Sequence, residues 1–266
     1  MKANLPLVSV AMITYNHECY LIDALESAIN QQTDFSYEII IGEDNSTDRT
    51  REIVETYQKN HPEIIKAIFQ TENIGAILNF ESVLNKCSGK YLTILEGDDY
   101  WINKDKLQIQ VDFLENHPDY SACFHNAKII QGTRKRKIRS YCDFKEDQSF
   151  SLNEMLKSNF IPTASVMFRN CVNEDFIARI RTVDASDWFI HVYNAERGKI
   201  YYFNEFMSVY RVHQNGLWSG LNDNDRIRFG IDTIFDMNRA FNYKYEKEFK
   251  NNLVGYAASL KGTVNP

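Results

Sequence analysis

Residues 91–99 read YLTILEGDD, a short apolar run that ends in a glycine and two aspartates. A run of this length between polar residues is typical of a strand that is covered on both faces of its sheet. Similar runs precede it at 7–13, 38–42 and 64–69. Helical spacing of apolar residues appears between these runs, at 17–32, at Ile53, Val54 and Tyr57 ahead of Pro62, and at 75–87. Alternation of this kind predicts an α/β fold with a parallel sheet and helices on both faces.

The alternation ends after residue 118. Further strands are expected at 120–130, 164–168, 199–204 and 206–212. Further helices are expected at 103–117, 151–158, 186–197, 222–242 and 245–261. The polar stretch 131–149 is expected to be a loop. We expect this second half to pack on the first half and not to form a free domain.

Composition excludes several classes of protein. The 266 residues are 44% hydrophobic and 25% charged, which is ordinary for a globular chain. A net charge of −6 disfavours nucleic acid as a partner, because phosphate contacts need a basic face. The five cysteines form no CxxC pattern, which favours reduced thiols in a cytoplasmic protein over disulfides or a zinc site. No apolar run approaches 18 residues, and Leu5–Ile13 is expected to be a strand and not a signal segment.

Polar residues follow three of the expected strands. They are Thr14-Tyr15-Asn16, Glu43-Asp44-Asn45 and Glu96-Gly97-Asp98-Asp99. Ligands of parallel sheets bind beyond the carboxyl ends of the strands, so these residues should share one site. Asp98 and Asp99 suit Mg²⁺ or Mn²⁺, although an aspartate pair can instead cap the helix that follows. The chain has neither GxGxxG nor GxxxxGK[ST], which argues against a Rossmann dehydrogenase and a P-loop enzyme.

Four motifs in order carry a resemblance to a known family. They are VSVAMITYN at 8–16, YEIIIGEDNSTDRT at 37–50, NIG at 73–75 and GKYLTILEGDDYW at 89–101. Together they resemble family 2 glycosyltransferases of the GT-A fold, and ASDWFI at 185–190 and YRVH at 210–213 extend the likeness. The resemblance implies a mostly parallel central sheet flanked by helices, an acceptor-side region and terminal helices. It also implies inverting transfer of a sugar from a nucleotide-sugar donor to an acceptor hydroxyl.

The resemblance divides the chain by role. Residues 1–118 are expected to bind the nucleotide sugar, 119–221 to face the acceptor, and 222–266 to form a C-terminal helical segment. The residues expected along the nucleoside are Thr14, Tyr15, Asn16, Glu18, Asp44, Asn73 and Asp98. Tyr15 is expected to stack on the base and Asp44 to accept an N–H from its edge, which favours uridine.

The resemblance also assigns a metal site and a catalytic base. Asp98 and Asp99 match the metal motif of the family, with Mn²⁺ or Mg²⁺ as the cofactor, and His213 approaches the metal or is structural. Glu96 stands where many members carry Asp, so no ribose contact is assigned to it. Asp187 matches the base, whereas Asp184 is expected to cap the helix.

The resemblance also implies an acceptor and a location for the protein. The family implies a glycan or lipid-linked acceptor in surface polysaccharide synthesis, in the cytoplasm or at the inner face of the membrane. The basic run Arg134–Lys137 with Arg139 either contacts anionic lipid or is a solvated loop. The stretch 245–260 either lies on a membrane or packs on the domain or on a second subunit. A non-catalytic nucleotide-sugar-binding protein and a nucleotidyltransferase remain as alternatives.

Overall fold

A single mixed sheet runs through the molecule, which is a computed structural model describing residues 5–131, 134–214, 216 and 218–253. Eight of its ten strands lie in the order β3-β2-β1-β4-β9-β6-β10-β5, while β7 pairs with β6 and β8 with β10. The mixed α/β fold with a helix-flanked central sheet is the predicted fold class. Among the described residues, no helix is both long and apolar enough to cross a bilayer.

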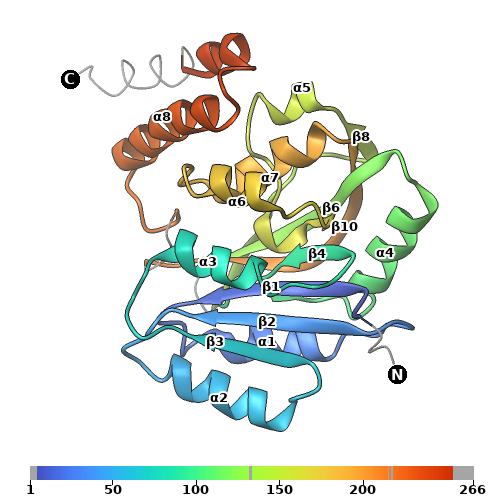
Figure 1. The fold of residues 1–266 in the computed structure, drawn as a ribbon, viewed down its shortest axis with the longest axis vertical. Helices are drawn as coiled ribbons and strands as arrows, with labels where there is room; N and C mark the ends of the chain where they lie inside the picture. The colour runs from blue at the N-terminus through green and yellow to red at the C-terminus, as the bar shows by residue number, and fades with distance from the viewer. Residues whose placement is uncertain (1–4, 132–133, 215, 217, 254–266) are drawn as a thin grey trace.

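The first half of the chain forms the parallel part of the sheet. Its strands are β1 (Val8–Thr14), β2 (Tyr37–Glu43), β3 (Ile65–Phe69) and β4 (Tyr91–Ile94). Its helices are α1 (Leu21–Ile29), α2 (Thr50–Asn60) and α3 (Ala76–Leu84). Figure 1 shows α3 on one face of this sheet and α1 and α2 on the other. Each face is sealed by its own apolar core, so strands β1 and β2 are covered on both sides, as their composition predicts.

The chain from residue 100 onward extends the same sheet with mixed strand directions. Its strands are β5 (Tyr100–Trp101), β6 (Tyr120–Gln131), β7 (Arg134–Ser140), β8 (Gln148–Phe150), β9 (Met167–Arg169) and β10 (Lys199–Val212). Strand β9 is antiparallel to both β4 and β6, and β10 is parallel to β6 but antiparallel to β5. Strand β5 follows the acidic turn, so its pairing with β10 brings the end of β10 to that turn.

Five numbered helices and one 3-10 turn lie in this part of the chain. They are α4 (Lys106–Asn116), α5 (Leu152–Met155), α6 (Glu174–Ile180), α7 (Ser186–Ala195), α8 (Asp223–Ala240) and the 3-10 turn Thr163–Ser165. A further helical stretch covers 246–253, the described part of the helix expected at 245–261. The rest of that expected helix lies outside the described residues.

Several expectations about individual elements are wrong. The stretch 131–149 contains strands β7 and β8 and is not a loop, because backbone pairing with β6 and β10 compensates for its polar side chains. The side chains of 134–137, the basic run, lie outside the described part of the chain. Strands expected at 199–204 and 206–212 are one strand, β10, with irregular pairing between Phe203 and Phe206. Helix α6 was not expected at all.

Candidate functional site

Three strand ends meet at one edge of the sheet. Thr14 ends β1 and pairs with Glu43 at the end of β2. The backbone N–H of Asp44 donates to the Thr14 carbonyl over 3.1 Å, and that of Gly97 donates to the Ile13 carbonyl over 3.0 Å. The polar residues after β1, β2 and β4 therefore lie together, as the sequence predicts.

The loop after β1 is held by the loop after β2. Asn16 has a φ of 55°, and its side-chain oxygen accepts the Thr47 N–H over 2.9 Å. Glu18 accepts the Arg49 N–H over 3.0 Å. Tyr15 is 41% exposed, so its ring is available to a ligand. Asn16 and Glu18 thus shape this loop, and helix α1 begins only at Leu21.

Asp44 is buried and holds a third loop. Its two carboxylate oxygens accept the backbone N–H groups of Ile74 (2.9 Å) and Gly75 (3.0 Å). Gly75 has a φ of 85°, which favours glycine at this turn. Asn73, directly before this turn, is exposed. Asp44 therefore places Asn73 beside the loops that follow β1 and β2.

Asp98 lies between two imidazoles. His213 Nε2 is 2.9 Å from Asp98 Oδ2, and His17 Nε2 is 3.9 Å from the same oxygen. Burial works to raise the pKa of Asp98, but the hydrogen bond with His213 and the two imidazoles outweigh it and lower the pKa. Burial also lowers the pKa of His17. The structure thus brings Asp98 and His213 together across 115 residues of sequence.

Asp99 points to a different place. It is 1% exposed, and its Oδ1 accepts the backbone N–H of Arg211 over 2.8 Å. Burial, followed by the charges of Asp98 and Glu96, raises the pKa of Asp99 well above its ordinary value. The two aspartates therefore have separate surroundings: Asp98 faces the imidazoles, and Asp99 faces the end of β10.

The charges of Asp98 and Asp187 both act on the carboxyl of Glu96. Burial, then the charges of Asp98 and Asp187, raises the pKa of Glu96 to about 8. Burial and the same Asp187 charge raise the pKa of Tyr141. Glu96 therefore lies electrostatically between the metal-motif aspartate and the expected base, and the acidic groups share one region.

Asp187 is the second residue of α7. Its Oδ2 accepts the Asn159 side-chain amide over 2.7 Å, and its Oδ1 accepts the Trp188 N–H over 2.8 Å. Asp184 is exposed and does not cap this helix, because α7 follows Ala185 without a side-chain capping bond. Trp188 is buried and donates to the Met155 carbonyl.

Three residues of this region were missed by the sequence analysis. They are His17, Asn159 and Arg211. His17 directly follows the first motif and Arg211 lies inside YRVH, so both stood beside a recognised signal. Asn159 lies in a segment without any motif, and only its contact with Asp187 reveals it.

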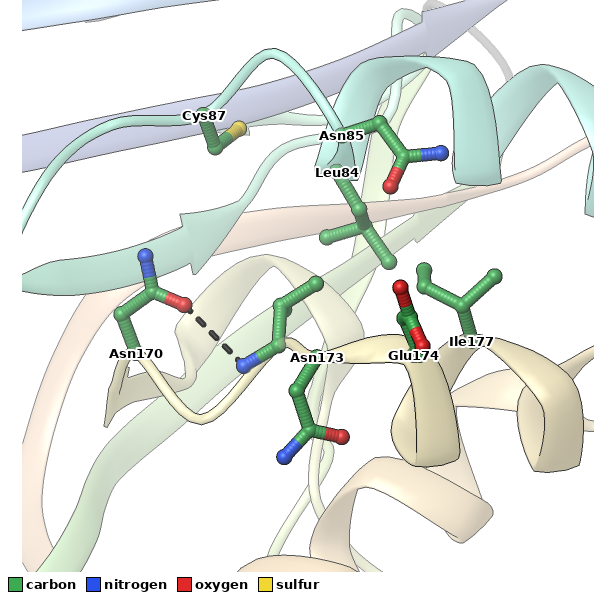
Figure 2. Close-up of a pocket in the computed structure, with 8 residues that line it drawn as sticks. Leu84, Asn85, Cys87, Asn170, Asn173, Glu174 and Ile177 are labelled. Carbon is green, nitrogen blue, oxygen red and sulfur yellow. Dashed lines mark hydrogen bonds between the residues drawn. The ribbon is translucent and has the colours of Figure 1, made fainter.

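A cavity of about 340 Å³ opens elsewhere, between the end of α3 and the start of α6. Figure 2 shows its lining side chains, among them Cys87, Asn170 and Asn173. The protein itself already uses two of the polar side chains: Asn170 bonds to Gly89 and Val172, and Asn173 caps α6. Gly89 contacts the start of β1, so this cavity lies at the amino ends of the strands, away from Asp98.

The donor atoms around Asp98 fit a divalent cation that takes some of its ligands from the protein and the others from a substrate. Within the described part of the chain, no three His, Cys, Asp or Glu side chains form a complete metal-ligand set. Mg²⁺ in nucleotide sites typically takes one or two carboxylates and completes its shell with phosphate oxygens and water. Asp98 and His213, whose donor atoms lie 2.9 Å apart, match this incomplete kind of site.

Known proteins are similar to this chain along most of its length. A curated relative, the putative teichuronic acid biosynthesis glycosyltransferase TuaG of Bacillus subtilis, is 31% identical over 80% of this chain and 82% of its own. An uncharacterized protein of Mycobacterium tuberculosis is 37% identical over 79% of this chain, which spans only 60% of that relative.

Solved structures confirm the fold at low identity. TarS of S. aureus in complex with UDP-GlcNAc has a TM-score of 0.66 at 18% identity, covering 94% of this chain and 71% of that one. A mannosyltransferase of Pyrobaculum calidifontis with GDP-Man and Mn²⁺ has a TM-score of 0.62 at 17% identity, covering 99% and 77%. These neighbours have the GT-A fold. The model of the glycosyl transferase family 2 matches residues 9–176, and the chain therefore belongs to glycosyltransferase family 2.

Proposed function

We propose that this protein transfers a sugar from a nucleotide-diphosphate sugar, most favourably a UDP-sugar, to an acceptor hydroxyl with inversion. The observation that carries the proposal is the arrangement around Glu96: Asp98, flanked by His17 and His213, and Asp187 both act on its carboxyl. Asp98 would face the diphosphate, and Asp187 would take the proton that leaves the acceptor hydroxyl. Family membership and the GT-A fold support this assignment.

The nucleoside end is assigned to residues 1–118. Tyr15, with its exposed ring, covers a face of the base, while Asn16 and Glu18 fix the loop that presents it. Each carboxylate oxygen of Asp44 accepts one backbone N–H from the loop at 74–75. Each oxygen therefore retains a lone pair that can accept an N–H of the base. Thr14 Oγ1 is buried and has no hydrogen-bond partner among the described residues, so we assign Thr14 to the wall behind these loops.

The diphosphate end is assigned to Asp98 and His213, which would hold Mn²⁺ or Mg²⁺ between them. When bound, the cation supplies charge neutralisation to the departing diphosphate. Asp99 is proposed to support this end from behind through its bond to Arg211, because its carboxylate is buried there.

Asp187 is proposed as the general base. Inverting transfer needs a carboxylate that receives the acceptor proton while the donor bond breaks on the opposite side. The Asn159 amide orients Oδ2 of Asp187, and Trp188 fixes Oδ1. Each oxygen keeps a lone pair for the acceptor hydroxyl. Residues 119–221, which carry Asp187, would then select the acceptor.

The acceptor is proposed to be a glycan or a lipid-linked glycan of a surface polysaccharide. The similarity to TuaG, a protein named for teichuronic acid biosynthesis, supports this class. The chain spans about 60% of the length of its mycobacterial relatives. The acceptor and the complete transfer activity are therefore proposals for this chain.

A thermal-shift panel tests the proposed function directly. The protein is heated with UDP-, GDP- and TDP-sugars, each with Mn²⁺ and with chelator. A ligand that binds only the native state raises the melting temperature by mass action. We expect the largest shift for a UDP-sugar with Mn²⁺, and none of that metal effect in Asp98→Asn. No shift with any nucleotide sugar would refute the proposal.

A further inference from the structure

Arg211 carries a buried charge next to the acidic turn. It lies near the end of β10, and only 4% of its side chain is exposed. A buried guanidinium is costly unless it is paired and hydrogen-bonded, and here Nη1 and Nη2 have partners whereas the buried Nε has none among the described residues. Its Nη2 forms an ion pair with Asp23 of α1, and its Nη1 donates to the main-chain carbonyl of Asp98 over 2.8 Å. One side chain therefore ties α1 to the turn that carries Asp98.

The main chain of Arg211 holds the same turn from a second direction. Its N–H donates to Asp99 Oδ1 over 2.8 Å. The antiparallel pairing of Val209 with Tyr100 explains this contact, because the next residues of β10 run back along the turn. Arg211 thus holds Asp98 by its carbonyl and Asp99 by its carboxylate.

Aromatic packing extends this contact to His213. The guanidinium carbon lies 4.4 Å from the centre of the Tyr100 ring and 5.3 Å from that of Tyr20. The Tyr20 ring in turn lies 4.7 Å from the His213 ring. His213 follows Arg211 by two residues, and its Nε2 is the atom 2.9 Å from Asp98 Oδ2. Both partners of the Asp98–His213 contact are therefore braced by Arg211.

We propose that Arg211, anchored by Asp23, is a positioning residue that sets the separation between the Asp98 carboxylate and the His213 imidazole for a nucleoside diphosphate and its divalent cation. This inference rests on the proposed function. A guanidinium presents its donors in a rigid planar fork, whereas a lysine ammonium is a point charge on a flexible stem. Lysine at 211 therefore keeps the charge but cannot hold Asp23 and the Asp98 carbonyl together in fixed geometry.

The test measures UDP binding by calorimetry with Mn²⁺ and with chelator, in wild type and in Arg211→Lys. The readout is the Mn²⁺ ratio, which we define as the dissociation constant of UDP with chelator divided by that with Mn²⁺. This ratio reports the contribution of the cation alone. Loss of a residue that orients a ligand of a metal typically costs 10- to 100-fold in metal affinity. We expect this ratio to fall by about tenfold in Arg211→Lys, with metal-free UDP binding unchanged.

The chain offers a matched control. Arg169 on β9 also forks between main-chain carbonyls, donating to Tyr120 (2.8 Å) and Leu114 (2.6 Å), and it lies over the ring of Tyr91. Tyr91 begins β4, so Arg169 lies at the opposite end of this strand from the acidic turn. Arg169→Lys should lower the melting temperature about as much as Arg211→Lys does. It should leave the Mn²⁺ ratio at its wild-type value.

Each outcome decides between the explanations. If Arg211→Lys does not fold, Asp23→Asn tests the same fork, because the Asp23 side chain is 59% exposed and tolerates the change. A wild-type ratio in the folded variant, or an equal loss in Arg169→Lys, would overturn the positioning role alone. UDP binding by wild type that does not respond to Mn²⁺ would overturn the proposed metal site and the positioning role with it.

Discussion

Lys106 is a fully buried lysine whose charge should destabilise the fold at neutral pH. It is the first residue of α4 and is 0% exposed. Its Nζ donates to Thr93 Oγ1 over 2.9 Å and lies 4.2 Å from the centre of the Trp101 ring. Burial lowers the pKa of Lys106 from 10.5 to about 7. We predict that Lys106→Met stabilises the protein at pH 7.

The size of the effect follows from the pKa. A pKa of 10.5 in the unfolded chain and about 7 in the folded chain costs the charged lysine about 4 kcal/mol at pH 7. A folded-state pKa expresses the net balance of all interactions of the ammonium, so the contact with Trp101 is not subtracted again. Methionine keeps the apolar stem but loses the hydrogen bond to Thr93, worth about 1 kcal/mol, so we expect a net gain of about 3 kcal/mol from Lys106→Met.

The sign of the pH dependence is the sharper part of the prediction. Between pH 7 and 10.5 the unfolded chain holds a proton on Lys106 that the folded chain has released, so wild-type stability rises with pH. From pH 7 to pH 9 the advantage of Lys106→Met should shrink by about 2 kcal/mol. This change does not depend on the packing of methionine, because packing contributes equally at both pH values.

Urea unfolding followed by tryptophan fluorescence at pH 7, 8 and 9 measures this difference. Lys104→Met is the matched control, since Lys104 is exposed and lies two residues before Lys106. Its stability should differ from wild type by less than about 0.5 kcal/mol, with the same difference at every pH. A Lys106→Met advantage that stays constant from pH 7 to pH 9 would refute the reasoning.

Three further predictions concern the proposed reaction. Asp187→Asn should leave donor binding intact and lower transfer by about 10²- to 10⁴-fold, whereas Asp184→Asn should stay active; the reverse result would show that the wrong aspartate was chosen. Tyr15→Ala should weaken UDP binding by about 1–3 kcal/mol in calorimetry and Tyr15→Phe should not, so equal affinity of the alanine variant contradicts base stacking. A Cβ at Gly97 would lie 2.7 Å from Thr14 Oγ1 and 2.9 Å from His17 Nδ1, so Gly97→Ala should weaken Mn²⁺-dependent UDP binding. An unchanged affinity in calorimetry would show that this close packing does not matter for the site.

The sequence predicted those parts of the fold that depend on short stretches of chain. Strands β1 to β4 have apolar runs that can be recognised without any partner, because burial of a strand favours apolar residues at most of its positions. Their order also indicated that the residues after β1, β2 and β4 meet at one edge. The expected roles of those residues stay predictions.

Segments that derive their structure from partners were not predictable in this way. Strand β7 is polar and was expected to be a loop, since its backbone bonds to β6 are invisible in its side chains. Strand β10 was expected to be two strands, because the polar residues near 204–205 interrupt the apolar pattern while the pairing with β6 resumes beyond them. Helix α6 has only seven residues, too few to show a clear period.

For the site, the sequence alone indicates the residue types but not their arrangement. Asp98 and His213 lie 115 residues apart, and the pairing of β10 with β5 is what places His213 Nε2 2.9 Å from Asp98 Oδ2. The same pairing turns Asp99 toward Arg211, although Asp98 and Asp99 are adjacent and chemically alike. Local patterns report which faces are buried, whereas contacts between distant residues depend on strand order and register. The sequence therefore determined the chemical groups available to this site, and the tertiary structure decided which of them face one another.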